Sequence, residues 1–161
     1  MLLPSFRRPI PPVIRALRSD RAEPCAALHA AAFAHPWSSA EFEALLSSKT
    51  TIGAAAIDPA NDELRGFALS RVAADEAEIL TIAVHKAYRN RGTGHALMVD
   101  ILSRLAASHV RALFLEVEWT NLAAIALYSR MGFREVGQRR GYYKKQDGSS
   151  ATALVLRKDV M

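Results

Sequence analysis

The most informative segment of the chain reads Val84-His85-Lys86-Ala87-Tyr88-Arg89-Asn90-Arg91-Gly92-Thr93-Gly94-His95. It connects residues that alternate like a strand to residues with helical periodicity. Its glycines allow a tight turn with accessible N–H groups, and the following helix adds unpaired donors and partial positive charge. Lys86, Arg89 and Arg91 are cationic, and no acid lies between Lys86 and His95. These features predict a diphosphate site; the alternative is a glycine-rich turn with a solvated basic face.

Two common phosphate-binding motifs do not fit this segment. A P-loop needs Gly-Lys-Ser/Thr before its helix, whereas His95 follows Gly94. The dinucleotide motif needs a third glycine, but Leu97 stands there. That motif also belongs on an early strand, whereas this segment lies past the middle of the chain.

Hydrophobic periodicity around the segment predicts a mixed order of elements. Strands are expected over 13–17, 50–57, 64–72, 78–84, 111–117, 133–140 and 151–160. Helices are expected over 21–33, from Ser38 or Ser39 onward, over 94–107 and over 121–130. Asp20, Ser38 or Ser39, and Asn121 are the expected N-caps, and Gly132 is the expected left-handed residue after the last helix.

The same patterns predict how the elements combine. Leu80, Ile82 and Val84 are expected on one face of their strand, and the strands at 50–57 and 64–72 form a hairpin. The later strand–helix–strand units favour locally parallel pairing within a mixed α/β sheet.

Length and composition favour a single globular domain. The chain has 161 residues, of which 50% are hydrophobic and 23% charged, and its net charge of +5 is too small to indicate nucleic-acid binding by itself. Cys25 is the only cysteine, so no internal disulfide forms, which fits a reducing cytosol. No apolar run is long enough for a membrane span. Residues 1–12 are proline-rich and are expected to form a flexible tail before a domain over 13–161.

Two motifs in the right order resemble the GNAT family of N-acetyltransferases. Arg89-x-x-Gly92-x-Gly94 resembles that family's acetyl-CoA-binding motif. Asn121-x-x-Ala124-x-x-Leu127-Tyr128-x-x-x-Gly132-Phe133 resembles the second half of its signature. The resemblance covers roughly residues 13–160. It implies a central, mostly antiparallel twisted sheet with about four helices and a parallel strand pair splayed at the acetyl-CoA site.

Other stretches are similar to the RimI-like branch, which acetylates the N-terminal alanine of a ribosomal protein. They are Ala34-His35-Pro36-Trp37-Ser38, Leu115-Glu116-Val117, Ala123-Ala124-Ile125-Ala126-Leu127-Tyr128 and Arg139-Arg140-Gly141-Tyr142-Tyr143. The chain departs from that branch at Glu118-Trp119-Thr120 and in its N-terminal tail. The resemblance implies a cytoplasmic enzyme that uses acetyl-CoA and a protein N-terminus, without a membrane or a direct nucleic-acid role. A monomer and a homodimer both stay open.

The resemblance also implies roles for particular residues. The backbone of Ile82, Ala83 and Val84 pairs with the pantetheine arm, and Asn121 and Tyr128 contact the cofactor. The loop that holds the pyrophosphate consists of Arg89, Asn90, Arg91, Gly92, Thr93 and Gly94. Glu116 is the favoured general base and Glu78 its rival, because a charged residue in an apolar strand is costly unless paired or functional. Tyr128 is the candidate general acid.

Three aromatic residues are candidates for the acceptor groove, with ordinary core or rim positions as the alternative: Trp37, Tyr142 and Tyr143. The histidines show no metal-ligand spacing, so no metal is expected. Two other functions stay open. One is acetylation of a lysine or a small amine, and the other is a non-catalytic module that binds acyl-CoA or RNA.

Overall fold

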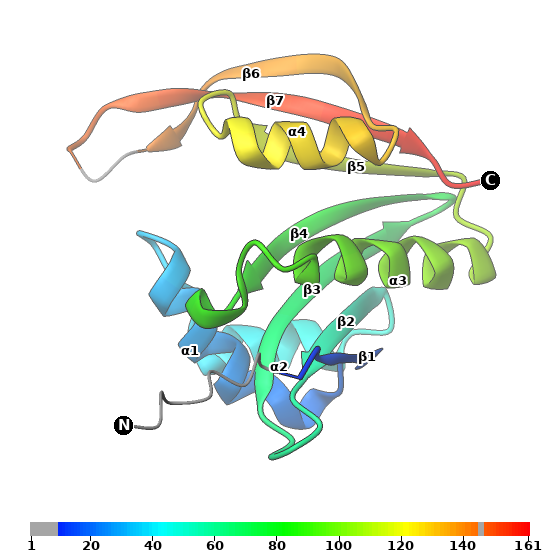
Figure 1. The fold of residues 1–161 in the computed structure, drawn as a ribbon. Coiled ribbons are helices and arrows are strands. Elements are labelled where there is room, and N and C mark those ends of the chain that lie inside the picture. Colours follow the sequence, from blue (N-terminus) through cyan, green and yellow to red (C-terminus); the bar gives the residue numbers. More distant parts are fainter. Residues whose placement is uncertain (1–9, 145–146) are drawn as a thin grey trace, which may run out of the picture.

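Strand pairing organises the molecule. The computed structural model describes residues 10–144 and 147–161, with the side chains of 142–144 outside that description. Within these residues, seven strands form one sheet in the order β1-β2-β3-β4-β5-β7-β6 (Figure 1). The strands are β1 Val13–Ala16, β2 Thr51–Ile57, β3 Leu64–Ala73, β4 Glu76–Val84, β5 Ala112–Glu118, β6 Arg134–Lys144 and β7 Ser150–Asp159. The helices are α1 Ala22–Ala32, α2 Ser39–Ser47, α3 Thr93–Ala107 and α4 Leu122–Arg130.

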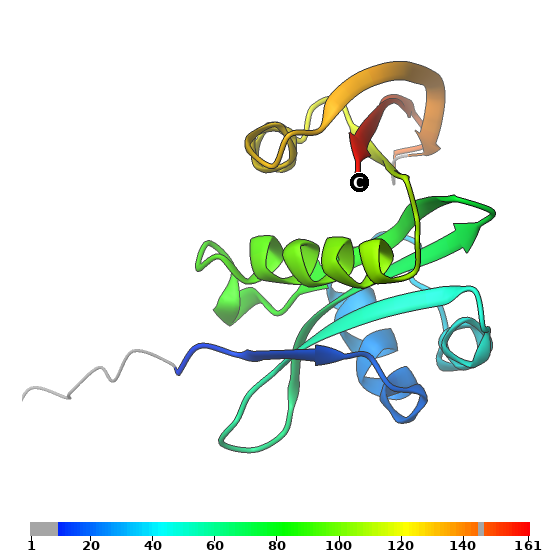
Figure 2. The ribbon, with the colours of Figure 1, turned by 90° about the vertical axis from the view of Figure 1, so that its right-hand side faces the viewer.

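Helices cover both faces of the sheet, and each face has its own apolar cluster. On one face, α3 and α4 pack on a cluster that includes Leu97, Ile101 and Leu113. On the other face, α1 and α2 pack on a cluster that includes Phe42 and Phe67. Figure 2 shows α3 and α4 on one side of the sheet and α2 on the opposite side. The predicted mixed α/β fold is confirmed.

The neighbouring strands β4 and β5 are parallel over a short stretch and then part. Residues 76–78 pair with residues 112–114, and from Ile79 onward the described ladder joins β4 to β3 alone. The register shows why: Thr81 pairs with Leu69 and Ile79 with Ser70, so Leu80 is an extra residue, a β-bulge. A bulge bends its strand, and this one follows directly after the last parallel pair. The predicted splayed parallel pair is therefore confirmed.

The bulge also decides which side chains share a face of β4. The prediction that Leu80, Ile82 and Val84 share one face is wrong. Ile82 and Val84 pack with the cluster under α3 and α4, whereas Leu80 packs with the cluster under α1 and α2. One extra residue reverses the alternation of side chains beyond it.

Only one of the two later strand–helix–strand units makes neighbouring parallel strands. The β4–α3–β5 unit does so, but β7 lies between β5 and β6 and pairs antiparallel with both. The strand β7, which comes last in the sequence, is therefore an inner strand of the sheet, and β6 is the edge strand. The hairpin expected from residues 50–57 and 64–72 is confirmed as β2 and β3.

The first two helices begin in different ways. The Ser38 hydroxyl accepts the N–H of Glu41 at 3.2 Å, and the Glu41 carboxylate accepts the N–H of Ser38 at 2.6 Å. This capping box confirms Ser38 as the N-cap of α2. Asp20 does not cap α1, because a 3-10 turn, Ser19–Arg21, precedes that helix and its N-cap is Arg21.

Candidate active site

The loop after β4 is shaped by residues with left-handed backbone. It contains a 3-10 turn, η2 Lys86–Tyr88, and then Asn90 and Gly92 with φ of 59° and 80° before α3 begins. Gly92 is the N-cap of α3, where positive φ favours glycine. Gly94 lies inside the first turn of α3 and has no such requirement.

Positive charge gathers at the start of α3. Lys86, Arg89 and Arg91 are exposed, and the chain has no acidic residue between Glu78 and Asp100. Arg89 donates from Nε to the carbonyl oxygen of Val84 at 3.0 Å, which places its side chain beside the end of β4. The first N–H groups of a helix and its dipole add to this charge. The loop therefore suits an anion with several phosphate oxygens.

Beside the loop, the last residues of β4 keep one strand edge open. Ile82, Ala83 and Val84 pair with β3, while the described ladder to β5 ends at Glu78. An open edge offers N–H and C=O groups to an extended ligand with amides of its own. The edge leads directly into the basic loop, so a long ligand could use both.

The two candidate bases lie on the same face of the sheet, around the point where β4 and β5 part. Glu78 pairs in the ladder with Phe114, and Glu116 lies two residues further along β5. The Glu116 side chain is 22% exposed, and its Oε1 lies 3.0 Å from Nε of Arg139. The Glu78 side chain is 50% exposed and forms an ion pair with Arg71. Glu116 is thus the more enclosed carboxylate.

Tyr128 belongs to the opposite face. It is 6% exposed on α4 and packs against the ring of Phe133, with centroids 5.6 Å apart. Burial raises the pKa of its phenol, so Tyr128 holds its proton at neutral pH. Tyr128 lies in the apolar cluster under α3 and α4 together with Leu115 and Val117, whereas Glu116 alternates with these two residues and points away from it.

Asn121 acts at the start of α4. Its side-chain oxygen accepts the N–H of Ala124 at 3.2 Å, which confirms the predicted N-cap. Gly132 follows the helix with φ of 90°, as predicted. Asn121 follows Glu118, the last residue of β5, by three positions.

Trp37 lies in an aromatic row between α1 and α2. Its ring stacks on His29 at 4.8 Å between centroids, and its backbone N–H donates to Nδ1 of His29 at 3.0 Å. Trp37 is half-buried, so it both packs the helices and lines the surface next to them. Tyr142 and Tyr143 lie in the last residues of β6, and their side chains are outside the described part of the structure.

Sequence reasoning missed a set of contacts that joins Tyr88 of the loop to Asp58 and Arg65 of the β2–β3 hairpin. The hydroxyl of Tyr88 donates to the carboxylate of Asp58 at 3.1 Å, and Arg65 contacts both residues. Asp58 reads only as a turn residue in the sequence, and Tyr88 reads only as part of the loop. No local pattern connects them, because they are thirty residues apart.

Cys25 is buried in α1 and offers no reactive thiol. Burial raises the pKa of this thiol to about 12, against the opposing charge of Arg21. A thiol with so high a pKa is protonated at neutral pH and is a poor nucleophile.

The described residues contain neither a candidate metal-binding cluster nor a candidate membrane-spanning helix. Across residues 10–144 and 147–161, no cluster of three or more His, Cys, Asp or Glu could hold a metal ion. In the same ranges, no helix has the length and apolar character to cross a membrane.

Comparison with known proteins settles the family. The acetyltransferase (GNAT) family matches the chain over residues 18–133. The chain belongs to the GNAT family. This GNAT chain is 42% identical over 88 residues to the ribosomal protein bS18-alanine N-acetyltransferase of Escherichia coli K12. That match covers 55% of the chain and spans 60% of the length of the relative.

Two longer matches lie within the same GNAT family. The N-alpha-acetyltransferase RimI of Mycobacterium tuberculosis is 37% identical over 157 residues, which is 92% of this chain and 93% of that protein. The crystal structure of the ribosomal-protein-S18-alanine N-acetyltransferase from Escherichia coli superposes with a TM-score of 0.84 at 31% identity. It covers 92% of this chain and 93% of the other.

Proposed function

We propose that this GNAT protein transfers the acetyl group of acetyl-CoA to the N-terminal α-amine of a protein, with a ribosomal protein as the acceptor. The observation that carries the proposal is the open edge of β4 leading into the basic loop at the start of α3. The edge suits the amides of a pantetheine arm, and the loop suits a pyrophosphate. The names of the related proteins support the acceptor.

The proposed binding residues lie along the open edge of β4 and the basic loop that follows it. Ile82, Ala83 and Val84 pair with pantetheine through their backbone, and the loop from Arg89 to Gly94 holds the pyrophosphate. Asn121 and Tyr128 approach the same ligand from α4. Acetyl-CoA then lies in the place where β5 would otherwise continue to pair with β4.

The proposed reaction is direct attack of the amine on the thioester. The amine nitrogen forms a bond to the carbonyl carbon, and the bond from that carbon to sulfur breaks. Glu116 takes the proton that nitrogen loses, and Tyr128 gives its proton to the leaving sulfur. Solvent then restores both groups, so acetylated amine and free CoA are the products.

The surroundings of each residue support these roles. Nε of Arg139 lies 3.0 Å from Oε1 of Glu116, which fixes the position of the carboxylate. Tyr128 keeps a proton to give because burial raises its pKa. The buried, protonated thiol of Cys25 argues against an acetyl-cysteine intermediate.

The chemistry of the acceptor favours an α-amine over a lysine. An α-amine has a pKa of about 8, so about a tenth is neutral at pH 7, whereas a lysine near 10.4 is neutral in less than one part in a thousand. An N-terminal amine therefore depends less than a lysine on a general base for its deprotonation. Trp37, Tyr142 and Tyr143 are the proposed contacts for the residues that follow this amine. We place the reaction in the cytoplasm, where ribosomal proteins are made.

Two conservative substitutions test the catalytic roles. Glu116→Gln is expected to lower kcat by about 10²- to 10⁴-fold, with little change in the Kd for CoA, because general base catalysis contributes that much. Tyr128→Phe is expected to lower kcat similarly. Free-thiol release gives kcat, and calorimetry gives Kd. Glu78→Gln and the exposed-site variant Ser129→Ala are the controls, and a large loss in Glu78→Gln would identify that residue as the base instead.

A panel of acceptors tests the substrate class. An Ala-starting peptide is expected to react faster than the same peptide with a blocked N-terminus and an added lysine, and faster than a polyamine. A preference for the lysine peptide or the polyamine would contradict the proposed acceptor. Binding of CoA without turnover of any amine would contradict the enzymatic activity itself.

A further inference from the structure

A small cluster of polar side chains, two of them buried and one half-buried, lies next to the basic loop. Asp58 is 9% exposed and Tyr88 is 8% exposed. Arg65 lies between them, with its guanidinium 3.3 Å from the Asp58 carboxylate and 5.2 Å from the centre of the Tyr88 ring. The catalytic scheme above uses none of the three.

Arg65 is placed here by an irregularity of the hairpin. Ala56 pairs with Gly66 and Ile57 with Leu64, so Arg65 is the extra residue of a β-bulge. Bulges redirect side chains and occur often next to active sites. The carbonyl oxygen of Arg65 also accepts the N–H of His85 at 2.7 Å, at the residue where β4 enters the loop. Arg65 therefore contacts the loop at its first residue and at Tyr88.

Tyr88 connects the cluster to the start of α3. Its hydroxyl donates to Asp58 at 3.1 Å, while its carbonyl oxygen accepts the hydroxyl of Thr93 at 3.3 Å. Thr93 is the first residue of α3 and is buried. The segment that carries Arg89, Asn90 and Arg91 is thus held at both ends, with its cations facing solvent.

The β2–β3 turn uses part of this cluster, since Asp58 Oδ1 accepts the N–H of Ala60 at 2.9 Å and Arg65 pairs with Glu63 at 2.7 Å, but it does not require Tyr88. A buried ion pair is a weak source of stability, and apolar residues of similar volume often stabilise a protein as well or better. In addition, Nε of Arg65 is buried and has no hydrogen-bond partner among the described residues. A costly polar arrangement next to a binding loop is better explained by the position that it gives to the loop.

We propose that Asp58, Arg65 and Tyr88 form a loop clamp that presets the basic loop for the pyrophosphate of the acetyl donor. They are positioning residues, since they act through the loop rather than on the reacting atoms. This inference rests on the proposed function, because it takes acetyl-CoA as the donor. It adds that the affinity for acetyl-CoA depends on the turn between β2 and β3, which lies outside the proposed binding residues.

A donor without the pyrophosphate separates positioning from general damage to the fold. In Tyr88→Phe the ring stays over Arg65, and only the hydroxyl is lost. Its KM for acetyl-CoA is expected to rise about tenfold, the size expected for one hydrogen bond to a charged group. Its kcat, and its KM for S-acetylpantetheine, are expected to match the wild type. The Kd for CoA from calorimetry is expected to rise with the KM for acetyl-CoA.

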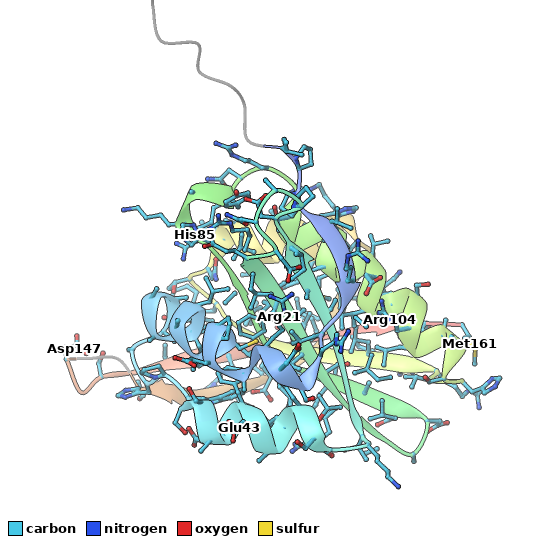
Figure 3. The ribbon with its side chains drawn as sticks, turned by 90° about the horizontal axis from the view of Figure 1, so that it is seen from below. Arg21, Glu43, His85, Arg104, Asp147 and Met161 are labelled. Atoms are coloured by element: carbon cyan, nitrogen blue, oxygen red, sulfur yellow. The ribbon has the colours of Figure 1, made fainter. Side chains whose placement is uncertain are left out.

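The same turn offers a matched control. Arg21 (labelled in Figure 3) binds Asp62 of this turn, with Nη2 to Oδ2 at 2.9 Å and Nη1 to the carbonyl oxygen at 2.7 Å. Arg21→Met weakens the turn without touching the clamp, so its KM for acetyl-CoA is expected to stay unchanged. Asp58→Asn serves as the second clamp variant if Tyr88→Phe does not fold.

Each outcome decides a separate question. An unchanged KM for acetyl-CoA in the clamp variants, or an equal rise for both donors, would overturn the loop clamp and leave the acetyltransferase activity in place. A wild-type protein that neither binds CoA nor consumes acetyl-CoA would overturn the proposed function, and the clamp with it.

Discussion

Gly92 and Gly94 stand close together in the loop but differ in what they require. Gly92 has φ of 80°, whereas a methyl group on Gly94 would meet only Leu127, at an ordinary 3.8 Å. Gly92→Ala is expected to lower the free energy of unfolding by about 1–2 kcal/mol, because a side chain disfavours left-handed backbone. Gly94→Ala is expected to keep full stability and to raise the KM for acetyl-CoA, because the methyl group would stand beside the proposed pyrophosphate. Urea unfolding and donor kinetics measure the two effects, and equal destabilisation by both substitutions would contradict this distinction.

His29 makes the stability of the protein depend on pH. Its ring stacks on both Phe33 and Trp37, and Nδ1 accepts the backbone N–H of Trp37. Burial lowers the pKa of His29 below its usual 6.5, against the opposing charge of Glu41. The unfolded chain therefore takes up a proton first as pH falls, so this contribution is complete above pH 6.5 and is lost as pH falls towards the folded-state pKa.

A substitution at His29 tests that dependence. Urea midpoints of the wild type are expected to fall between about pH 7.5 and about pH 5, and those of His29→Gln to fall less. The exposed His35 is the control, so His35→Gln is expected to follow the wild type. If the urea midpoint of His29→Gln fell at acid pH as much as that of the wild type, the titrating group would be another residue.

Single residues with local requirements were predictable from the sequence. The N-caps Ser38 and Asn121 and the left-handed Gly132 follow from contacts within a few residues. Residues with distant partners were not predictable. Arg139 meets Glu116 only because β7 brings β6 near β5, and no spacing in the sequence records that neighbourhood.

Among the elements, α3 was the most predictable, because its apolar face repeats with helical periodicity. Ile101 is fully buried in the cluster between α3 and the sheet, whereas Val99 on the same helix is 48% exposed. Ile101→Ala is expected to lower the free energy of unfolding by about 2–5 kcal/mol, and Val99→Ala to change it by less than about 0.5 kcal/mol. Urea unfolding measures both, and similar losses would mean that α3 packs on a different face.

Strands were less predictable than helices because their register depends on a partner. The extra residue at Leu80 follows from the pairing of β4 with β3, and it reverses the faces of the residues beyond it. In the same way, the position of β7 between β5 and β6 depends on a long-range pairing. The sequence order strand–helix–strand describes both later units equally well, although only one makes a neighbouring parallel pair.

For the molecule as a whole, the described pairing between neighbouring strands is shortest between β4 and β5, where only three residue pairs form. Beyond the parallel pairs at residues 76–78 and 112–114, Arg111 adds one backbone hydrogen bond to Asp75 at 2.7 Å. A ligand that lies between the strands would join the two parts of the sheet. CoA at a hundred times its Kd is therefore expected to stabilise the protein by about 2.7 kcal/mol, which thermal unfolding measures as a higher Tm.

Hydrogen exchange shows where that stabilisation acts. Amides of residues 80–84 and of the loop over 86–94 are expected to exchange more slowly with CoA, while those of the hairpin at 51–57 change little. Protection that spreads evenly over the sheet, or a Tm that does not change, would contradict binding between β4 and β5.

The open edge of β4 has a second consequence, for the behaviour of the protein in concentrated solution. Unpaired backbone in the middle of a sheet offers a foreign strand the same template as an exposed edge strand, and such templates promote aggregation. In the proposed complex, the donor covers β4 and therefore also shields it from other polypeptides. Occupancy by the donor and resistance to aggregation therefore both depend on the backbone of β4.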